Sequence, residues 1–231
     1  MKLLTALDLI GLVVFAVCWW GYPWYAERRE RHRPGLVQLT NRYRYEWMRQ
    51  MLARDLRMVD TALINTLTQS SVFFSSTTVL ILGGLLALVG TSETMQTALG
   101  KLPGAVPTSE QVWELKLLLL VAIFVYAFFK FTWSMRQFNF AGILVGAAPP
   151  HDAAPDDAIA LAAGKMAERA AEDFNQGLRA YYFAFAALSW FVNPALFIGA
   201  TLAVMAILYI LEFRSNAVKV LAAGAPPVRE P

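Results

Sequence analysis

The segment from Asn41 to Gly90 places the tightest constraint on how this chain can fold. Its first part, NRYRYEWMRQMLARDLRMVD, is amphipathic and rich in arginine, and its second part is apolar but carries many small polar residues. No glycine or proline separates the two parts. Because these two residues are the usual breakers of helices, we predict a single long helix that leaves the cytoplasmic surface and crosses the bilayer.

The composition is typical of a membrane protein. Of the 231 residues, 57% are hydrophobic and 16% are charged, whereas a soluble domain carries about 25% charged residues. The apolar residues occur in blocks that approach the roughly 20 residues needed to cross hydrocarbon. We therefore expect one integral membrane domain without a large soluble core. The single cysteine, Cys18, excludes an intrachain disulfide and a metal cluster built on cysteine.

The apolar blocks predict an all-α integral membrane protein with four transmembrane helices, long cytoplasmic extensions and amphipathic interfacial segments. We expect this domain to occupy residues 1–215 and residues 216–231 to form a disordered tail. The predicted spans are 3–25, 65–90, 113–135 and 184–211, and the predicted cytoplasmic loops are 26–60 and 136–180.

Lysine and arginine are distributed unevenly along the chain. Fourteen of them fall in or beside the first and third loops, and six fall in the second loop and at the ends. Since basic residues are enriched on the cytoplasmic side, we predict a multi-pass protein of the bacterial inner (plasma) membrane. Its first and third loops are expected to be cytoplasmic and both termini to lie outside. The outer end would then hold Asp8, Glu114, Lys116, Glu212 and Arg214, and the arginine-rich segment would contact anionic lipid headgroups.

Polar residues of the second span fall on more than one helical face. Asn65, Gln69 and Ser76 share one face, whereas Ser71 and Thr78 lie on another. One interpretation is packing within a bundle, where Ser and Thr bond to neighbouring helices or to their own backbone. The other is that Asn65, Gln69 and Ser76 line a solute path, because neutral dipoles coordinate an ion without a buried fixed charge.

The fourth apolar block, Tyr181 to Leu211, contains Asn193 followed by Pro194. Proline removes a backbone donor, so we expect the helix to break or kink at Pro194. The break is either part of the bundle geometry or a hinge that brings Asn193 into the solute path, since broken helices are tolerated where neighbours or water satisfy them.

Several polar residues gather at the predicted inner end of the third span. Lys130 and Ser134 are four residues apart and Gln137 follows three later, so the three share a face. Together with Arg57 they are candidates for the cytoplasmic mouth of a solute path. The alternative is that Lys130 extends to the headgroups. Asp8, near the outer end of the first span, is either paired locally or a proton or cation contact.

The sequence shows no arrangement of residues typical of an enzyme. His32 and His151 lie in separate loops without the spacing of metal ligands, and no phosphate-binding loop, nucleophile elbow or dinucleotide fingerprint occurs. We therefore expect no catalytic residue, metal or cofactor. The arginine-rich segment adjoins a membrane helix and lacks a nucleic-acid-binding module, so nucleic acid is not an expected partner.

Four passages resemble a known family. They are NRYRYEWMRQMLARDLRMVDTALINTL, FFSSTTVLILGGLLALVG, ELKLLLLVAIFVYAFFKFTWSMRQFNFAGILVGAAP and FNQGLRAYYFAFAALSWFVNPALFIGATLAVMAILYILEF. The chain is similar to the bacterial and plant membrane proteins grouped as domain of unknown function 599, over most of residues 3–213. The resemblance implies a four-span membrane protein, and it implies no activity, ligand or site residue.

Two functional hypotheses follow. The first is an oligomeric channel or transporter for a small ion or polar solute, in which symmetry supplies a pore that four helices alone rarely enclose. The expected partners are then membrane lipids and further copies of the chain. The alternative is a structural or accessory subunit that packs against another membrane complex or organises lipid.

Overall fold

The computed structural model describes residues 4–30, 33–89, 104, 106, 108–153 and 156–226, and all regular secondary structure in these ranges is helical. The helices are α1 (Ala6–Glu30), α2 (Leu36–Leu52), α3 (Met58–Val89), α5 (Glu110–Ala147), α6 (Asp157–Ser189), α7 (Pro194–Phe213) and α8 (Asn216–Ala223). Four helical stretches are long and apolar enough to cross a membrane, namely α1, α3, α5 and the stretch that begins with α7. The predicted all-α class with four apolar spans is therefore confirmed.

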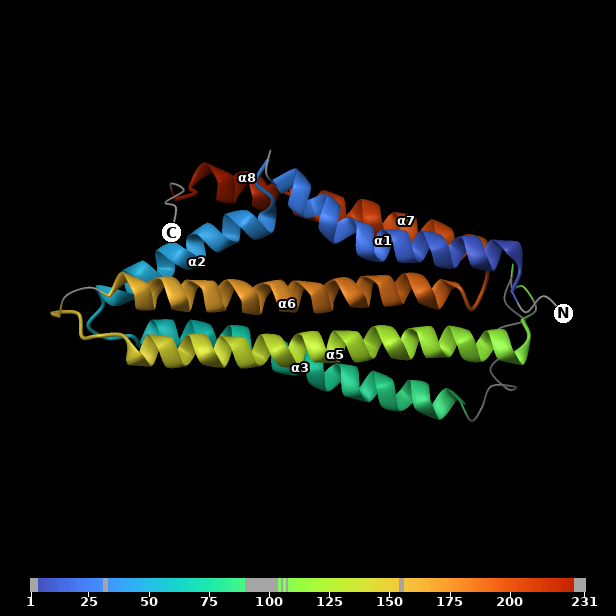
Figure 1. The fold of residues 1–231 in the computed structure, drawn as a ribbon, viewed down its shortest axis with the longest axis horizontal. Helices are drawn as coiled ribbons and strands as arrows, with labels where there is room; N and C mark the ends of the chain where they lie inside the picture. The colour runs from blue at the N-terminus through green and yellow to red at the C-terminus, as the bar shows by residue number, and fades with distance from the viewer. Residues whose placement is uncertain are drawn as a thin grey trace.

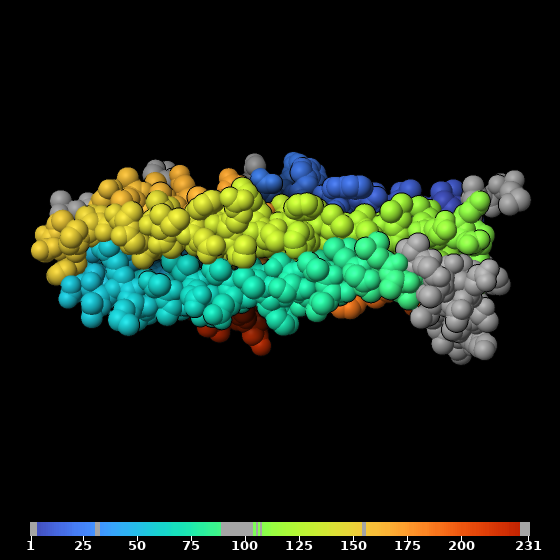
Figure 2. Space-filling model, turned by 90° about the horizontal axis from the view of Figure 1, so that it is seen from below, coloured from blue at the N-terminus to red at the C-terminus, as the bar shows by residue number. Residues whose placement is uncertain are grey.

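The helices form an elongated layer (Figure 1). The antiparallel helices α5 and α6 run along the length of the molecule, α3 lies on the outer side of α5, and α1 and α7 lie on the outer side of α6. Seen from below, α3 forms part of the surface beside α5 (Figure 2). Since α3 packs mainly on α5, its opposite face is left uncovered.

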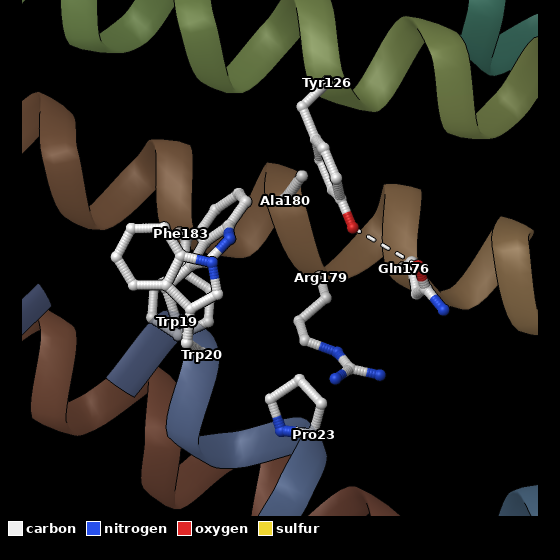
Figure 3. A pocket seen from close by; sticks show the side chains of 8 residues that line it. All are labelled: Trp19, Trp20, Pro23, Tyr126, Gln176, Arg179, Ala180 and Phe183. Atoms are coloured by element: carbon white, nitrogen blue, oxygen red, sulfur yellow. Dashed lines mark hydrogen bonds between the residues drawn. The ribbon is translucent and has the colours of Figure 1, made fainter. Parts of the chain in front are cut away.

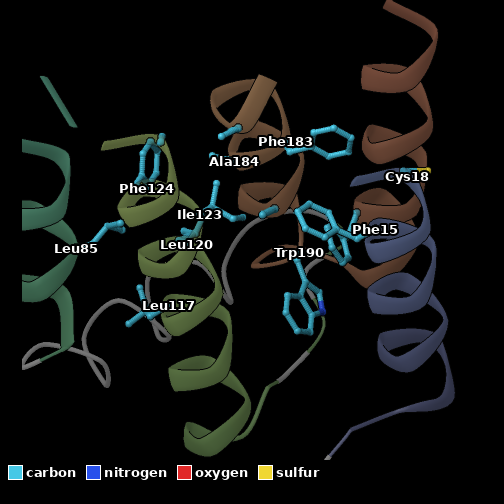
Figure 4. Packing of buried hydrophobic residues seen from close by; sticks show 14 of the residues in the cluster. Phe15, Cys18, Leu85, Leu117, Leu120, Ile123, Phe124, Phe183, Ala184 and Trp190 are labelled. Atoms are coloured by element: carbon cyan, nitrogen blue, oxygen red, sulfur yellow. The ribbon is translucent and has the colours of Figure 1, made fainter. Parts of the chain in front are cut away.

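A core of aromatic side chains joins α1, α6 and α7 (Figure 4). The ring of Phe15 lies 5.4 Å from the rings of both Phe183 and Phe197. Trp190, which is completely buried, stacks on Phe197 at 5.3 Å. Along α1 and α6 the contacts run in opposite order, because Asp8 meets Trp190 and Phe15 meets Phe183. Along α1 and α7 they run in the same order, because Phe15 meets Phe197 and Arg29 meets Tyr209. Helix α6 is therefore antiparallel to its two neighbours.

A second core lies where α2 packs against α6, beyond the apolar layer. The face of α6 that is buried here consists mainly of small residues, which allow neighbouring helices to approach closely. These residues are Ala160, Ala163, Gly164, Ala167, Ala170 and Ala171. Asp156 caps the start of α6 by accepting hydrogen bonds from Ala158 N and Ile159 N.

The prediction of a single helix from Asn41 to Gly90 is wrong. Helix α2 ends at Leu52 and α3 begins at Met58. The fully buried carboxylate of Asp60 accepts a hydrogen bond from Trp47 Nε1 at 2.7 Å and pairs with Arg54, which fixes the turn. Long-range packing therefore breaks a segment that lacks any local breaker, because α2 can cover α6 only if the chain changes direction.

The predicted fourth span, 184–211, is also wrong as a single helix. Helix α6 ends at Ser189, and α7 begins at Pro194 and runs back in the opposite direction (Figure 1). Asn193 caps α7 by accepting a hydrogen bond from Ala195 N at 2.8 Å, and Pro194 occupies the first turn, where a missing N–H has no cost. The second half of α6 thus lies within the same layer as the four apolar stretches.

This reversal changes the predicted topology. Near the end of α7, the rings of Tyr209 and Phe213 lie 5.2 and 5.3 Å from the guanidinium of Arg29, at the end of α1. The start of α1 and the end of α7 are therefore at opposite ends of the molecule, an arrangement that differs from the predicted one, in which both termini share one side. The predicted grouping of Glu212 with Asp8 and Lys116 is wrong for the same reason.

The prediction that residues 216–231 form a disordered tail is wrong for its first half. Residues Asn216–Ala223 form α8, which Ser215 caps by accepting a hydrogen bond from Val218 N at 3.4 Å. Tyr43 of α2 donates a hydrogen bond to the carbonyl of Leu221 at 3.1 Å. Helix α8 is therefore fixed against α2, and residues 227–231 lie outside the described part of the chain.

Candidate functional site

The predicted polar face of α3 lies on the uncovered side of this helix. Asn65, Gln69 and Ser76 are all exposed, and their side chains make no hydrogen bond within the described part of the chain. Neighbouring hydroxyls on the same side differ, because Thr66 and Thr77 donate to backbone carbonyls one turn earlier at 3.0 and 2.9 Å. A hydroxyl bonded in this way is satisfied by its own helix, whereas the two amides are not.

The second polar face of α3 packs into the protein. Ser71 and Ser134 are hydrogen-bonded at 3.0 Å, and Thr78 is hydrogen-bonded to Tyr181 at 2.8 Å. Ser134 also donates to the carbonyl of Ala170 at 2.7 Å. The bundle-packing interpretation thus holds for this face, and the two faces of α3 have different environments.

The four residues predicted to share a solute path are not brought together. Asn193 lies at the turn between α6 and α7, where its Nδ2 donates to the carbonyl of Gly104 at 3.1 Å. Because Ser71 faces Ser134 of the antiparallel α5, Asn65 and Gln69 lie toward the far end of α3, away from this turn. Within one chain, only Asn65, Gln69 and Ser76 form a continuous strip, and we call these three residues the α3 strip.

The predicted cytoplasmic mouth divides into two structures. Lys130 forms an ion pair with Asp173 of α6 at 2.8 Å, and Gln137 donates to the other oxygen of the same carboxylate at 2.5 Å. With the buried Ser134 they form a polar row between α5 and α6, so the prediction that they share a face is confirmed. Arg57 lies apart from this row and donates to the carbonyl of Ala148 at 2.7 Å, which caps α5.

Asp8 is paired locally at the opposite end of the molecule. Its Oδ1 accepts a hydrogen bond from Trp190 Nε1 at 2.7 Å, and its Oδ2 accepts one from Thr5 N at 2.9 Å. Thr5 Oγ1 in turn accepts from Asp8 N at 3.2 Å, which is a capping box at the start of α1. Lys116 lies with its Nζ 5.4 Å from the ring of Trp190. The local-pairing interpretation of Asp8 is thus confirmed.

A polar cluster between α2 and α6 lies outside the apolar layer. Asn41 Nδ2 donates to Glu168 at 2.8 Å, and the hydroxyl of Tyr45 donates to the other oxygen of this carboxylate. Burial, together with the bonded Glu168, raises the pKa of Tyr45 above its usual value. Burial also raises the pKa of Glu172, with Glu168 and Asp173 adding to the effect and Arg169 and Lys130 opposing it.

Sequence reasoning missed a crevice on the side of the molecule (Figure 3). It encloses about 190 Å³, with walls from α1 and α5 and a floor from α6 that includes Arg179. In the sequence, Arg179 is one of the fourteen basic residues in or beside the first and third loops. The available signal was its position, because it directly precedes the apolar run AYYFAFAALSWF. A charge at the border of a membrane segment is a candidate for function.

Residues 10–217 match a family model described as Protein of unknown function, DUF599. The chain belongs to the DUF599 family. The match extends from α1 to the start of α8 and confirms the resemblance found in the sequence. Neither a curated protein nor a solved structure matches this DUF599 chain.

Among the described residues, no group of three or more His, Cys, Asp or Glu side chains could hold a metal ion. The α3 strip and the Arg179 crevice both contain polar side chains that make no hydrogen bond or ion pair to another described residue. Each has a separate consequence for function.

Proposed function

We propose that this DUF599 protein forms a homo-oligomer in the bacterial inner membrane and provides a path for a small ion or polar solute, with α3 facing the axis. The observation that carries the proposal is the α3 strip, whose side chains are exposed and unbonded along one helix. Burying an amide without a hydrogen-bond partner costs about 1–3 kcal/mol. These groups therefore favour a position against water or another protein chain.

A second copy is a suitable neighbour because of how α3 packs. Helix α3 contacts α5 on one side, and Gly83 and Gly84 on its outer half have open space around them. Small residues of this kind allow helices from two copies to approach closely. A ring of such helices presents neutral dipoles to its axis, which bind a solute weakly enough for release.

The test is flux through liposomes that contain the purified full chain. Asn65→Ala combined with Gln69→Ala should lower ion flux several-fold while leaving expression and oligomer size unchanged. The matched control is Thr66→Ala combined with Ser70→Ala, since these hydroxyls bond to their own helix at 3.0 and 3.2 Å. Flux no greater than in empty liposomes, or a monomer by native mass spectrometry, would contradict the proposal.

One observation favours the alternative, an accessory subunit of another membrane complex. Leu56, Met58 and Val59 are 71%, 75% and 62% exposed, and they lie at the junction of α2 and α3, outside the apolar layer. Exposed apolar side chains that cluster in this way are typical of protein interfaces. Co-purification of a stoichiometric foreign partner in mild detergent, lost in Met58→Ser with Val59→Ser, would support this alternative.

A further inference from the structure

The crevice beside α6 has a polar part and an apolar part that lie next to each other (Figure 3). Arg179 and Gln176 of α6 contribute the polar part. Trp19 and Trp20 of α1 and Phe183 of α6 contribute the apolar part. The ring of Trp19 meets the ring of Tyr126 of α5 edge-on at 5.5 Å, which links the two walls. A ligand that fits must therefore be amphipathic.

Arg179 carries a charge without a counter-ion in contact. Within the described residues, its guanidinium makes no hydrogen bond or ion pair, and it lies 5.2 Å from the ring of Tyr22, which holds it in place. Glu212 acts on it through space, but its carboxylate accepts a hydrogen bond from Val37 N at 3.4 Å instead. A guanidinium offers five donors in a planar fork suited to phosphate. Arg179 is therefore prepared for an anion.

Gln176 can contribute a second donor. The hydroxyl of Tyr126 donates to Gln176 Oε1 at 3.3 Å, which fixes the orientation of the amide. Its Nε2 group then remains free to donate into the crevice (Figure 3). Arg179 and Gln176 are three residues apart, so their side chains leave neighbouring turns of α6 on the same side (Figure 3).

The crevice lies beside the basic end of the apolar helices. Arg179 follows Asp173, the partner of Lys130, by six residues, so it stands about 9 Å to the apolar side of this ion pair, and its long side chain can extend back toward the headgroups. Trp20 and Trp24 next to it are 73% and 63% exposed, as in the aromatic belt at a membrane interface. The crevice thus lies at the basic end of the molecule, where anionic lipids are enriched if that end is cytoplasmic.

We propose that this crevice binds the phosphate of an anionic phospholipid, with Arg179 and Gln176 donating to its oxygens and an acyl chain lying against Trp20. The volume of about 190 Å³ accommodates a headgroup phosphate and glycerol but not a whole lipid. The acyl chains then remain in the bilayer. The site is on α6, separated from the α3 strip by α5, and does not rest on the proposed solute path.

The experiment uses the full chain in nanodiscs of phosphatidylcholine in which 20% of the lipid is replaced by brominated phosphatidylglycerol. Bromine quenches nearby tryptophan, so Trp19 and Trp20 should be quenched more than with brominated phosphatidylcholine at the same fraction. Arg179→Gln should weaken this preference about ten- to hundredfold, as expected for the loss of a charge-assisted hydrogen bond. The matched control is Arg28→Gln, an exposed arginine 5.3 Å from the ring of Trp24 and outside the crevice.

Three outcomes would overturn the proposal. They are equal quenching by the two brominated lipids, an unchanged preference in Arg179→Gln, and an equal loss in Arg28→Gln. Inorganic phosphate forms the separate arm. Two results together would show that the site binds a soluble anion and not a lipid. Inorganic phosphate alone would displace phosphatidylglycerol at millimolar concentration, and it would raise the melting temperature of the protein as much as phosphatidylglycerol does. Should Arg179→Gln fail to fold, Arg179→Lys keeps the charge, removes the fork and should still lower the preference several-fold.

Discussion

Gly177 determines how closely α5 and α6 pack. A Cβ atom at this position would lie 2.6 Å from Cε1 of Phe131, which is itself fully buried. Gly177→Ala should therefore lower the free energy of unfolding by about 1–3 kcal/mol through overpacking. The control is Gly199→Ala on α7, because no atom lies within 4 Å of a Cβ built at Gly199. This substitution should raise the free energy of unfolding by about 0.5–1 kcal/mol, since alanine favours a helix more than glycine does. Melting temperatures in detergent, followed by tryptophan fluorescence, measure both, and equal values would contradict the packing.

Asp60 fixes the turn between α2 and α3. Asp60→Ala leaves Trp47 Nε1 without its partner at 2.7 Å, and the free energy of unfolding should fall by about 1–3 kcal/mol. Asp55→Ala is the matched control, because the Asp55 side chain is 79% exposed and its pair with His151 is contributing little. Limited proteolysis between Leu52 and Met58 should accelerate in the first variant only. Similar cleavage of both would show that the turn is fixed by something other than Asp60.

Glu172 should make stability depend on pH. Burial raises the pKa of Glu172 above its model-compound value of 4.5, so this carboxyl binds a proton on folding in the window just above 4.5. The stability it contributes is present below 4.5 and is lost as the pH rises through the raised pKa. Glu172→Gln should therefore flatten the melting temperature between pH 4 and 8. A curve parallel to that of the wild type, or an equal change in the exposed Glu114→Gln, would refute this assignment.

Residue spacing in the sequence predicted which side chains share a helical face better than it predicted what those side chains contact. Helical spacing correctly placed Lys130, Ser134 and Gln137 on one face, but it could not show that Asp173, 36 residues beyond Gln137, covers that face. Likewise, spacing gave the α3 strip but not which side of α3 would be covered. Both answers depend on contacts between distant segments.

The turn between α6 and α7 sets the topology of the whole chain. With α6 crossing the layer, the start of α5 and α8 lie toward opposite ends of the molecule (Figure 1). In a Cys18→Ser background, Glu110→Cys and Lys219→Cys should react with a membrane-impermeant maleimide from opposite sides. Labelling of both from the same side would restore the four-crossing topology. Arg214 and Lys219 would then leave the basic end, where this structure places them.

The two helix predictions that are wrong, for Asn41–Gly90 and for 184–211, failed because the local sequence does not show unambiguously that the chain turns there. Residues 53–57 contain no breaker, so only the buried contacts of Asp60 reveal the turn. Asn-Pro is ambiguous, because the same pair can kink a helix or cap and start one. Length was the better signal, since 31 apolar residues from Tyr181 to Leu211 span about 46 Å as a helix, well beyond hydrocarbon of about 30 Å.

At the scale of the whole molecule, the outer face of α3 predicts how copies meet. In a Cys18→Ser background, Ser76→Cys should form a disulfide-linked dimer on mild oxidation in the membrane. Leu118→Cys, 63% exposed on α5, should remain monomeric on the same gel. Equal cross-linking of the two would indicate random collision, and cross-linking of the second alone would place the interface on α5.

The general class of the molecule followed from hydropathy, because the lengths of apolar segments alone require membrane helices. The side-by-side order of the helices, in contrast, could not be predicted from hydropathy. An open layer and a closed bundle have the same hydropathy profile, and they differ in which faces bury small residues or aromatic rings. Gly177 against Phe131 and Phe15 between α6 and α7 settle this order only once their partners are known.

Helix α5 has 38 residues and no interruption, so it is about 57 Å long, nearly twice the hydrocarbon thickness of about 30 Å. A hydrocarbon layer of this thickness would cover only about half of α5, and α6 runs beside α5 along its length (Figure 1). Such a pair acts as a stiff rod without a joint. A force applied by another protein near Val145, at one end of this helix pair, therefore also tilts the part of the pair that lies in the membrane.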